Sequence, residues 1–575
     1  MKKYFLLISI LFISTNLIAQ TVWNEVWNLQ QVPFQIENSS SEYAKVISGF
    51  DTDEDGWGEF ITGYTDLANN YVFMYEATGD NTYEMVWYFE FPLSASSYFG
   101  AAVGDADNNG IVDIAIGYPA VVSAENPNPP RVFFFSWNGV QGENKYGREQ
   151  GDGTFTSSSE TYFDVPVNTD WRPYSMIIED VDKDDENEVV IGVRAGGRGR
   201  EVLVASAVGD PSGGFGSWGV EYNYQHDENG SNYCTITGDL DNDGLTDIIE
   251  IVWWQLTLRM FEVTGPDTYE HVNDIETVYS AEGIDFGSVD GAAILDINGD
   301  GKNELVISGA DDAAIEKRMF LIQNITDIST ITADDIVEFY TFPTRIKPNG
   351  SPLASSGLRN MDVGDPDQDG KISLMIAGEK NGQIYDLEYK GEGDLADSSS
   401  WELTIAYDSF EEAAIELGDS LASSLTPRLY YGALAGDMDG DGLMEYVFNN
   451  YSTDKDIWAN DMYVSIIEAD KATDVATSNK LIPKELALAQ NYPNPFNPST
   501  TIDFSIPSTL NGSSTTVKLS IFDILGREVE VLVNKEMTAG NYSIKFDANN
   551  FPSGIYIYKL SAGAKAKTMK MTLLK

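Results

Sequence analysis

The chain has 575 residues and a formal net charge of −56. That length exceeds one ordinary compact domain, unless the domain is a large ring or array. The charge argues against nucleic acid and anionic membrane surfaces as partners, because both bind basic patches. Charged residues at 22% and aromatic residues at 12% are typical of a folded chain. Cys234 is the only cysteine, so the chain cannot form an intrachain disulfide.

Residues 1–20 have the pattern of a secretory signal peptide. Lys2 and Lys3 are followed by a short, mostly apolar run to Ile13 and by a small residue, Ala19, near the end. No later stretch is long and apolar enough to cross a bilayer, so we expect no transmembrane segment in the mature chain. An exported chain without disulfides needs another source of stability, and bound metal can supply it.

An acidic loop recurs seven times over residues 21–470. Oxygen-bearing side chains occupy positions 1, 3, 5 and 9 of the loop, and a glycine at position 6 permits the sharp turn. Such side chains, with the backbone carbonyl of position 7, suit a hard cation that takes six to eight oxygens, above all Ca²⁺. The candidate ligands, loop by loop, are Asp51, Asp53, Asp55 and Glu59; Asp105, Asp107, Asn109 and Asp113; Asp180, Asp182, Asp184 and Glu188; Asp239, Asp241, Asp243 and Asp247; Asp296, Asn298, Asp300 and Glu304; Asp365, Asp367 and Asp369; and Asp437, Asp439, Asp441 and Glu445.

The loops differ in their ligands. Asn109 and Asn298 each replace one carboxylate, and we expect both loops to bind because amide oxygens ligate Ca²⁺. The loop at Asp365 has Ser373 at position 9, so we expect its site to be the weakest. Asp185 replaces the usual glycine in the third loop, which adds turn strain. We therefore expect up to seven structural Ca²⁺ ions.

The loop pattern has two other interpretations. An EF-hand is excluded, because strands rather than helices flank the loops and position 12 is Glu only in the fourth loop, at Glu250. Turns in which aspartates cap their own backbone without metal remain the alternative.

Four short strands can be assigned to each repeat unit. One strand precedes the loop, a second follows it, a third alternates apolar and polar residues, and a fourth precedes the next unit. Seven such units predict an all-β fold with a seven-bladed β-propeller over residues 21–470. The last unit lacks a fourth strand, whereas residues 22–29 resemble residues 83–89, the fourth strand before the second loop. We therefore expect residues 22–29 to close the last blade, with an open solenoid as the alternative.

Residues 98–119 carry Phe99-Gly100, an acidic loop and Gly117-Tyr118-Pro119. This segment resembles the FG-GAP/VCBS repeats of integrin-alpha-like propellers, and the resemblance extends from residue 21 to about residue 470. It implies that the acidic loop joins the first two strands of a blade and binds Ca²⁺.

The composition changes beyond a polar linker at residues 471–485. Residues 486–575 hold nine Lys or Arg and six Asp or Glu, and six or seven short strands there predict a small Ig-like β-sandwich. Residues 490–500, 522–529 and 552–558 resemble the type A sorting domain of the type IX secretion system. The resemblance implies the type IX machinery as a partner and a secreted or surface-attached location. A carbohydrate-binding or fibronectin-like module is the alternative.

Catalytic motifs are scarce. His226 and His271 lie on or near predicted outer strands, which favours surface positions, and Cys234 is expected to be a buried, inert thiol. One group of residues on units three and four offers a candidate for a polysaccharide lyase or hydrolase. It consists of Arg194, Arg198, Arg200, Tyr222 and His226.

The favoured interpretation is a binding or adhesion protein, because a rigid disc presents loops at its faces. Its ligand is expected to be a carbohydrate or a protein. Tyr118, Trp171, Trp218 and Trp401 are candidate contacts, although packing inside the blades is the favoured interpretation for any one of them. A polysaccharide lyase or hydrolase and a structural surface-layer component are the alternative functions.

Overall fold

The protein is described here from a computed structural model. The structure describes residues 21–35, 42–65, 70–95, 97, 99–163, 165–196, 200–208, 217–226, 231–252, 256–276, 291–310, 317–353, 357–451, 453–471, 487–488, 491, 494, 496, 498–506, 515–522, 524, 527–537, 540–548, 551–562 and 565–574. The predicted signal peptide, Arg198 and nearly all of the predicted linker lie outside these residues.

One compact unit spans Thr21–Ala472 and contains seven four-stranded antiparallel sheets. Blade one holds β2 (Glu42–Phe50), β3 (Glu59–Thr65), β4 (Asn70–Gly79) and β5 (Thr82–Glu90). Blade two holds β6 (Gly100–Gly104), β7 (Asp113–Gly117), β8 (Val132–Ser136) and β11 (Ser159–Thr161). Blade three holds β12 (Trp171–Glu179), β13 (Glu188–Gly196), β14 (Arg200–Val208) and β15 (Ser217–His226). Blade four holds β16 (Asn232–Gly238), β17 (Thr246–Val252), β18 (Thr257–Gly265) and β19 (Thr268–Glu276).

The remaining blades follow the same order. Blade five holds β20 (Ala292–Leu295), β21 (Glu304–Ala310), β22 (Lys317–Ile322) and β23 (Val337–Phe342). Blade six holds β24 (Met361–Gly364), β25 (Ser373–Gly378), β26 (Gln383–Tyr389) and β27 (Trp401–Asp408). Blade seven holds β28 (Leu429–Gly436), β29 (Met444–Asn450), β30 (Val464–Ala469) and, as its outer strand, β1 (Trp23–Leu29).

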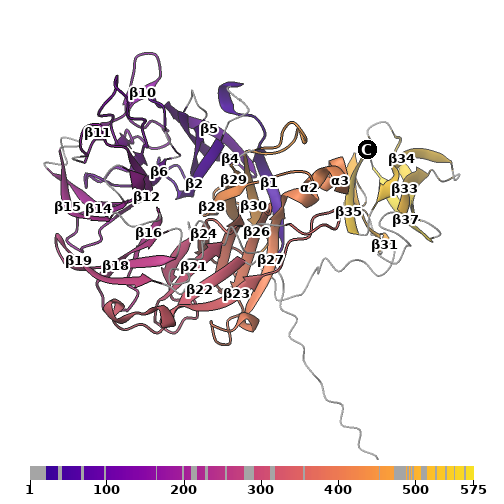
Figure 1. The fold of residues 1–575 in the computed structure, drawn as a ribbon. Helices are drawn as coiled ribbons and strands as arrows, with labels where there is room; N and C mark the ends of the chain where they lie inside the picture. The colour runs from indigo at the N-terminus through magenta and orange to yellow at the C-terminus, as the bar shows by residue number, and fades with distance from the viewer. Residues whose placement is uncertain are drawn as a thin grey trace, which may run out of the picture. The chain divides into compact units, whose positions relative to one another are not determined.

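The first strands of the blades form a closed cycle. β2 contacts β6, β6 contacts β12, and the contacts continue through β16, β20, β24 and β28 back to β2. Figure 1 shows the sheets arranged around a common centre. β1 pairs antiparallel with β30, with Trp23 opposite Ala469 and Leu29 opposite Val464, so the start of the propeller unit completes its last sheet. The fold is therefore a seven-bladed β-propeller, and the prediction of an all-β chain is confirmed.

The hydrophobic cores lie between neighbouring sheets. Ile61 of blade one packs in one cluster with Ile114 of blade two, and Met319 of blade five packs with Ile376 of blade six. A strand between two such cores is buried on both faces, as is all of β17. This arrangement explains why the second strand of each blade reads as a short apolar run.

The sequence predicts an all-β fold, whereas two short helices lie between blades six and seven of the structure. α2 (Ser409–Leu417) begins at the cap residue Asp408, whose carboxylate accepts from the N–H groups of Phe410 and Glu411, and α3 (Asp419–Ala422) follows. None of the helices in the described residues has the length and apolar character that crossing a membrane requires.

The C-terminal unit contains two sheets. One holds β31 (Ala487–Leu488), β32 (Ser499–Ile506) and β35 (Gly540–Asp547), and the other holds β34 (Glu528–Met537), β33 (Thr515–Phe522), β36 (Gly554–Ala562) and β37 (Lys565–Leu573). Both sheets contribute to one core, for example through Phe504 and Phe546 on one side and Leu519 and Tyr558 on the other. This is the small β domain that the sequence predicts.

Candidate metal centres and axial cluster

Each acidic loop joins the first and second strands of its blade. In the fourth loop, the carboxylate of Asp239 accepts from the N–H groups of Asp243 and Gly244, at 3.1 and 3.0 Å. Asp243 accepts from the N–H of Leu245 at 2.7 Å, and Asp247 accepts from the N–H of Leu240 at 2.8 Å. These bonds hold the carboxylates of positions 1, 5 and 9 on the inside of the turn. Loops one, two, three and five repeat all of them.

Two residues in each loop adopt the left-handed conformation. Position 6 has positive φ throughout, including Asp185 at 74°, which lacks the freedom of glycine. Position 4 does so as well, a feature that the sequence analysis missed. The sequence does carry a signal for this conformation, because position 4 is Gly or Asn in four of the seven loops and these residues tolerate positive φ. The position 4 residues are Glu54, Asn108, Lys183, Asn242, Gly299, Gln368 and Gly440.

The carboxyl groups at position 9 are buried where each loop meets the second strand of its blade, and burial opposes their ionisation. Burial raises the pKa to about 8 for Glu59, Glu188, Asp247 and Glu445, and to about 7 for Asp113 and Glu304. The other carboxylates of the same loops raise these pKa values further. A bound cation would remove both costs.

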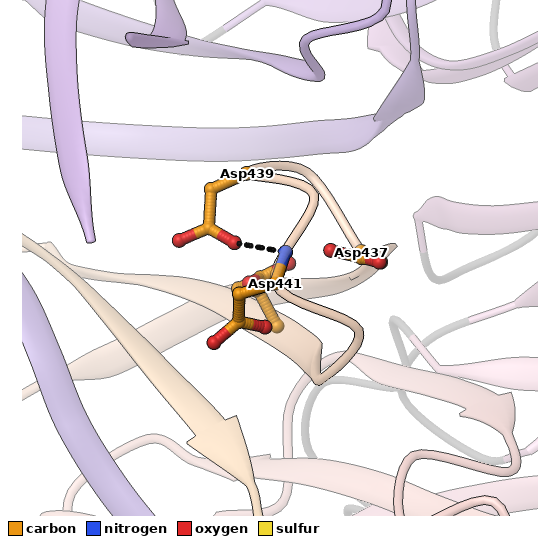
Figure 2. Close-up of side chains that lie close together, drawn as sticks. Asp437, Asp439 and Asp441 are labelled. Carbon is orange, nitrogen blue, oxygen red and sulfur yellow. Dashed lines mark hydrogen bonds between the residues drawn. The ribbon is translucent and has the colours of Figure 1, made fainter. Parts of the chain in front are cut away.

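The loops bring most of the predicted ligands together. Carboxylate oxygens lie within 4.8 Å of one another in four of these loops: Asp51, Asp53 and Glu59; Asp105, Asp107 and Asp113; Asp180, Asp182 and Glu188; and Asp437, Asp439, Asp441 and Glu445. Figure 2 shows Asp437, Asp439 and Asp441 of the seventh loop, where the N–H of Asp441 donates to Asp439. In loops four and five the position 9 carboxyl is likewise within electrostatic reach of its partners.

Several carboxylate oxygens of the loops are buried without a hydrogen-bond partner in the residues that the structure describes, and they indicate whether the loops can hold a cation. Both carboxylate oxygens of Asp107 lack a hydrogen-bond partner in the described part of the chain, although the residue is only 4% exposed. The same holds for one oxygen each of Asp53, Asp113, Asp182 and Glu445. A buried, unpaired carboxylate oxygen is costly, and several that converge fit a hard cation with oxygen ligands.

The sixth loop, which has Ser373 instead of a carboxylate at position 9, makes different contacts from the other loops. Ser373 Oγ donates to Asp386 at 2.7 Å and so turns to the neighbouring strand. Lys371, at position 7, forms an ion pair with Asp369 and lies 3.3 Å from Glu388 Oε1 on the third strand. An ammonium group of the chain itself therefore neutralises carboxylates at this loop.

Third-strand glutamates were missed by the sequence analysis. Across the sheet, Glu76 stands opposite Glu59, and Glu468 stands opposite Glu445. Asp53, Asp55 and Glu76 form a further group of carboxylates within 4.8 Å. Finding them required the register between strands, which the spacing of the loops alone does not give.

A layer of side chains lies six positions before the first aspartate of the loops. It includes Lys45, Tyr174, Tyr233, Arg359 and Tyr431, on or next to the first strands of blades one, three, four, six and seven. Six extended residues span about 20 Å, so this layer lies near the face of the ring opposite the acidic loops.

Contacts within this layer cross the centre of the ring. Lys45 Nζ lies 4.2 Å from the ring centroid of Tyr174, in blade three, and 4.3 Å from that of Tyr431, in blade seven. The hydroxyls of Tyr174 and Tyr431 are hydrogen-bonded. Arg359 lies over Tyr233 at 5.2 Å. Blades one and three, three and seven, and four and six are not neighbours, so these contacts lie on the axis.

Further residues complete what we call the axial cluster. Arg428 packs on Tyr430 and Tyr451 and forms an ion pair of 2.5 Å with Glu379, which also faces Arg359. Burial alone would raise the pKa of Glu379, but the charges of Arg359 and Arg428 hold it below its usual value. The cluster consists of Lys45, Tyr174, Arg194, Tyr233, Arg359, Glu379, Arg428, Tyr430, Tyr431 and Tyr451. It thus holds four cationic side chains and one carboxylate.

The structure divides the candidate lyase or hydrolase group. The side chain of His226 is buried, with Nε2 at 3.0 Å from Glu250 Oε1, so the prediction of a surface position was wrong. It is buried because the outer strand β15 packs against blade four, which supplies Glu250 and Arg259. Arg194 instead packs on Tyr233 in the axial cluster, and Tyr222 stacks on Tyr269.

The candidate aromatic contacts are mostly blade packing. Tyr118, Trp171 and Trp401 are buried, and Trp171 Nε1 donates to Glu201 at 2.8 Å. Trp218 stacks on Phe134 with ring centroids 4.6 Å apart. Packing inside the blades, the interpretation favoured for each ring, accounts for these residues, because their large apolar areas fill the space between blades.

The class of protein defined by fold and motif is an exported β-propeller. Residues 490–574 match the family model of the secretion system C-terminal sorting domain. The chain therefore carries a C-terminal sorting domain of the type IX secretion system, which directs it across the outer membrane to the cell surface or the extracellular space.

Comparisons of the whole chain give only distant likenesses. No curated protein matches the chain. The exotype rhamnogalacturonan lyase YesX is 11% identical over 77% of this chain and 74% of that one, with a TM-score of 0.37. The Dos1 propeller is 9% identical over 75% of this chain and 78% of that one, with a TM-score of 0.38. The periplasmic gluconolactonase PpgL of Pseudomonas aeruginosa is 9% identical over 64% and 95%, with a TM-score of 0.35. At these values the likenesses carry no argument about activity.

Proposed function

We propose that the chain is a calcium-stabilised binding or adhesion protein of the FG-GAP/VCBS type. Its parts are a signal peptide at residues 1–20, a propeller at 21–470, a linker at 471–485 and the sorting domain at 486–575. The propeller is the functional part, and the sorting domain brings it to the cell surface or the medium by way of the type IX machinery.

The observation that carries the calcium assignment is the convergence of buried, unpaired carboxylate oxygens in the loops. Asp107 at position 3 and Asp113 at position 9 present three such oxygens in one loop. Oxygen donors of this number and charge suit Ca²⁺ better than softer metals. When bound, the ion supplies charge neutralisation, and the role of the loops is structural.

The observation that supports ligand binding is the axial cluster. In a chain of net charge −56, four cationic side chains gather with five tyrosines on the ring axis. Lys45, Arg194 and Tyr451 are partly exposed, and the Arg428 side chain is 32% exposed, so a ligand can reach this face of the cluster. Guanidinium groups bind carboxylates and sulfates, and tyrosine rings stack on sugars. The ligand class that fits best is therefore an acidic polysaccharide.

Binding of acidic and neutral polysaccharides to the intact chain, by titration calorimetry in excess Ca²⁺, tests this function. We expect binding of polyuronates or sulfated glycans, and a loss of at least about tenfold in affinity in R428A and K45A. K347A is the matched control, because Lys347 also lies over an aromatic ring, Phe410, but outside the axial cluster. Equal affinity in R428A, K45A and the wild type would show that the cluster only packs the axis.

A further inference from the structure

The third-strand glutamates of blades one and seven face an electrostatic problem. Glu468 is directly opposite Glu445, and both are almost fully buried, at 5% and 0% exposed. Like charges directly across two strands destabilise a sheet, and burial increases that cost. Glu76 and Glu59 repeat this pairing in blade one, at 7% and 0% exposed.

Glu468 is also aimed at the acidic loop without a partner for its charge. Its Oε1 has no hydrogen-bond partner among the described residues. The carboxylates of Asp441, at position 5 of the loop, and Asp439 are close enough to act on it electrostatically. Ionised carboxylates this close repel one another, so the approach is stabilised only by a proton on one of them or by a cation between them.

Blade six shows what occupies the equivalent place. Glu388 stands opposite position 9 in the register that Glu76 and Glu468 have in their blades. The ammonium group of Lys371 lies between Glu388 and the position 5 carboxylate of Asp369. In blades one and seven, position 7 is Trp57 or Leu443, which offers no charge.

We propose that Glu76 and Glu468 each complete a second calcium site, separate from the site formed by positions 1, 3, 5 and 9, at the place that Lys371 fills in blade six. The ligands in blade one are Asp53, Asp55 and Glu76, whose oxygens lie within 4.8 Å of one another. Asp439, Asp441 and Glu468 are the counterparts in blade seven. The aspartates at positions 3 and 5 thereby bridge two ions. These sites rest on the proposed calcium loops and add one ion to each of the two blades that close the ring.

Calcium counting by native mass spectrometry of the intact chain tests this assignment. E76Q and E468Q keep the shape of the side chain and remove its charge, and each is expected to bind one Ca²⁺ fewer than the wild type. E262Q is the matched control, because Glu262 stands opposite Asp247 in blade four but is partly exposed. It is expected to keep the full number of ions.

A second variant, which adds a charge instead of removing one, distinguishes the loss of an ion from a folding defect. L443K places an ammonium group at position 7 of blade seven, as Lys371 does in blade six. We expect L443K to lose one Ca²⁺ and to melt at a higher temperature than the wild type in EGTA. An unchanged ion count in E468Q and L443K would overturn the second site. A wild type without any bound Ca²⁺ would instead overturn the proposed calcium loops.

Discussion

Asp439, in the acidic loop of blade seven, accepts a hydrogen bond from the backbone N–H of Asn81, in the β4–β5 turn of blade one, at 2.6 Å. The bond joins the last blade to the first. Position 3 makes a similar bond to the following blade in four other loops. The pairs are Asp53 with Asn144, Asp182 with Asp267, Asp241 with Ile328 and Asp367 with Thr21. The acidic loops therefore link neighbouring blades even without metal.

The D439A variant tests this link. Removing the carboxylate leaves the N–H of Asn81 without its acceptor, and a lost charged hydrogen bond of this kind costs about 1–3 kcal/mol. We expect the free energy of unfolding to fall by that amount in urea titrations run in EGTA, where calcium plays no part. D334A, which removes an exposed aspartate outside the loops, is the control and should unfold like the wild type. Equal stability of D439A and the control would contradict the link.

The pH dependence of stability should change sign with calcium. Without metal, burial raises the pKa of Glu445 and Glu59 from 4.5 to about 8, so the folded chain holds more protons than the unfolded chain between these values. The free energy of unfolding then decreases as the pH rises through this window. With calcium the carboxylates must be ionised to bind, so stability increases with pH.

Melting temperatures at about pH 5 and about pH 8, in EGTA and in excess Ca²⁺, measure this reversal. E445Q should flatten part of the EGTA profile, because it removes one buried ionisable group. E54Q, at an exposed position of loop one, should leave the profile unchanged. Parallel profiles in EGTA and Ca²⁺ would contradict the assignment.

Position 6 offers a reciprocal pair of variants. Asp185 has φ 74°, whereas Gly244 has φ 91° with open space where a Cβ would lie. D185G should raise the free energy of unfolding by about 1 kcal/mol and G244D should lower it by about the same amount, because only glycine adopts this conformation without cost. Urea unfolding in EGTA measures both. Changes of the same sign in the two variants would refute this explanation.

The repeat made the propeller predictable from sequence. Alternation and turn residues indicate strands, and each of the seven sheets has the four strands that the sequence predicts. The similarity of residues 22–29 to residues 83–89 pointed to the strand that pairs with β30. Local patterns sufficed here because six of the seven blades are each built from one continuous segment of the chain.

Features that depend on contacts between distant segments were not predictable. His226 is buried by residues of the next blade, and the axial cluster joins blades that are not neighbours. Glu468 faces the acidic loop only because its strand pairs with β29 in one particular register. A single sequence shows the spacing of residues along the chain, but it does not show which residues meet across the ring.

Thermal melting of the intact chain in excess Ca²⁺ and in excess EGTA tests the central claim most directly. Ions bound only by the folded state stabilise it by about 2.7 kcal/mol per site at a hundredfold excess over Kd. With several such sites, we expect EGTA to lower Tm by about 10 °C or more, and added Ca²⁺ to restore it. The same Tm in Ca²⁺ and in EGTA would contradict a calcium-stabilised propeller.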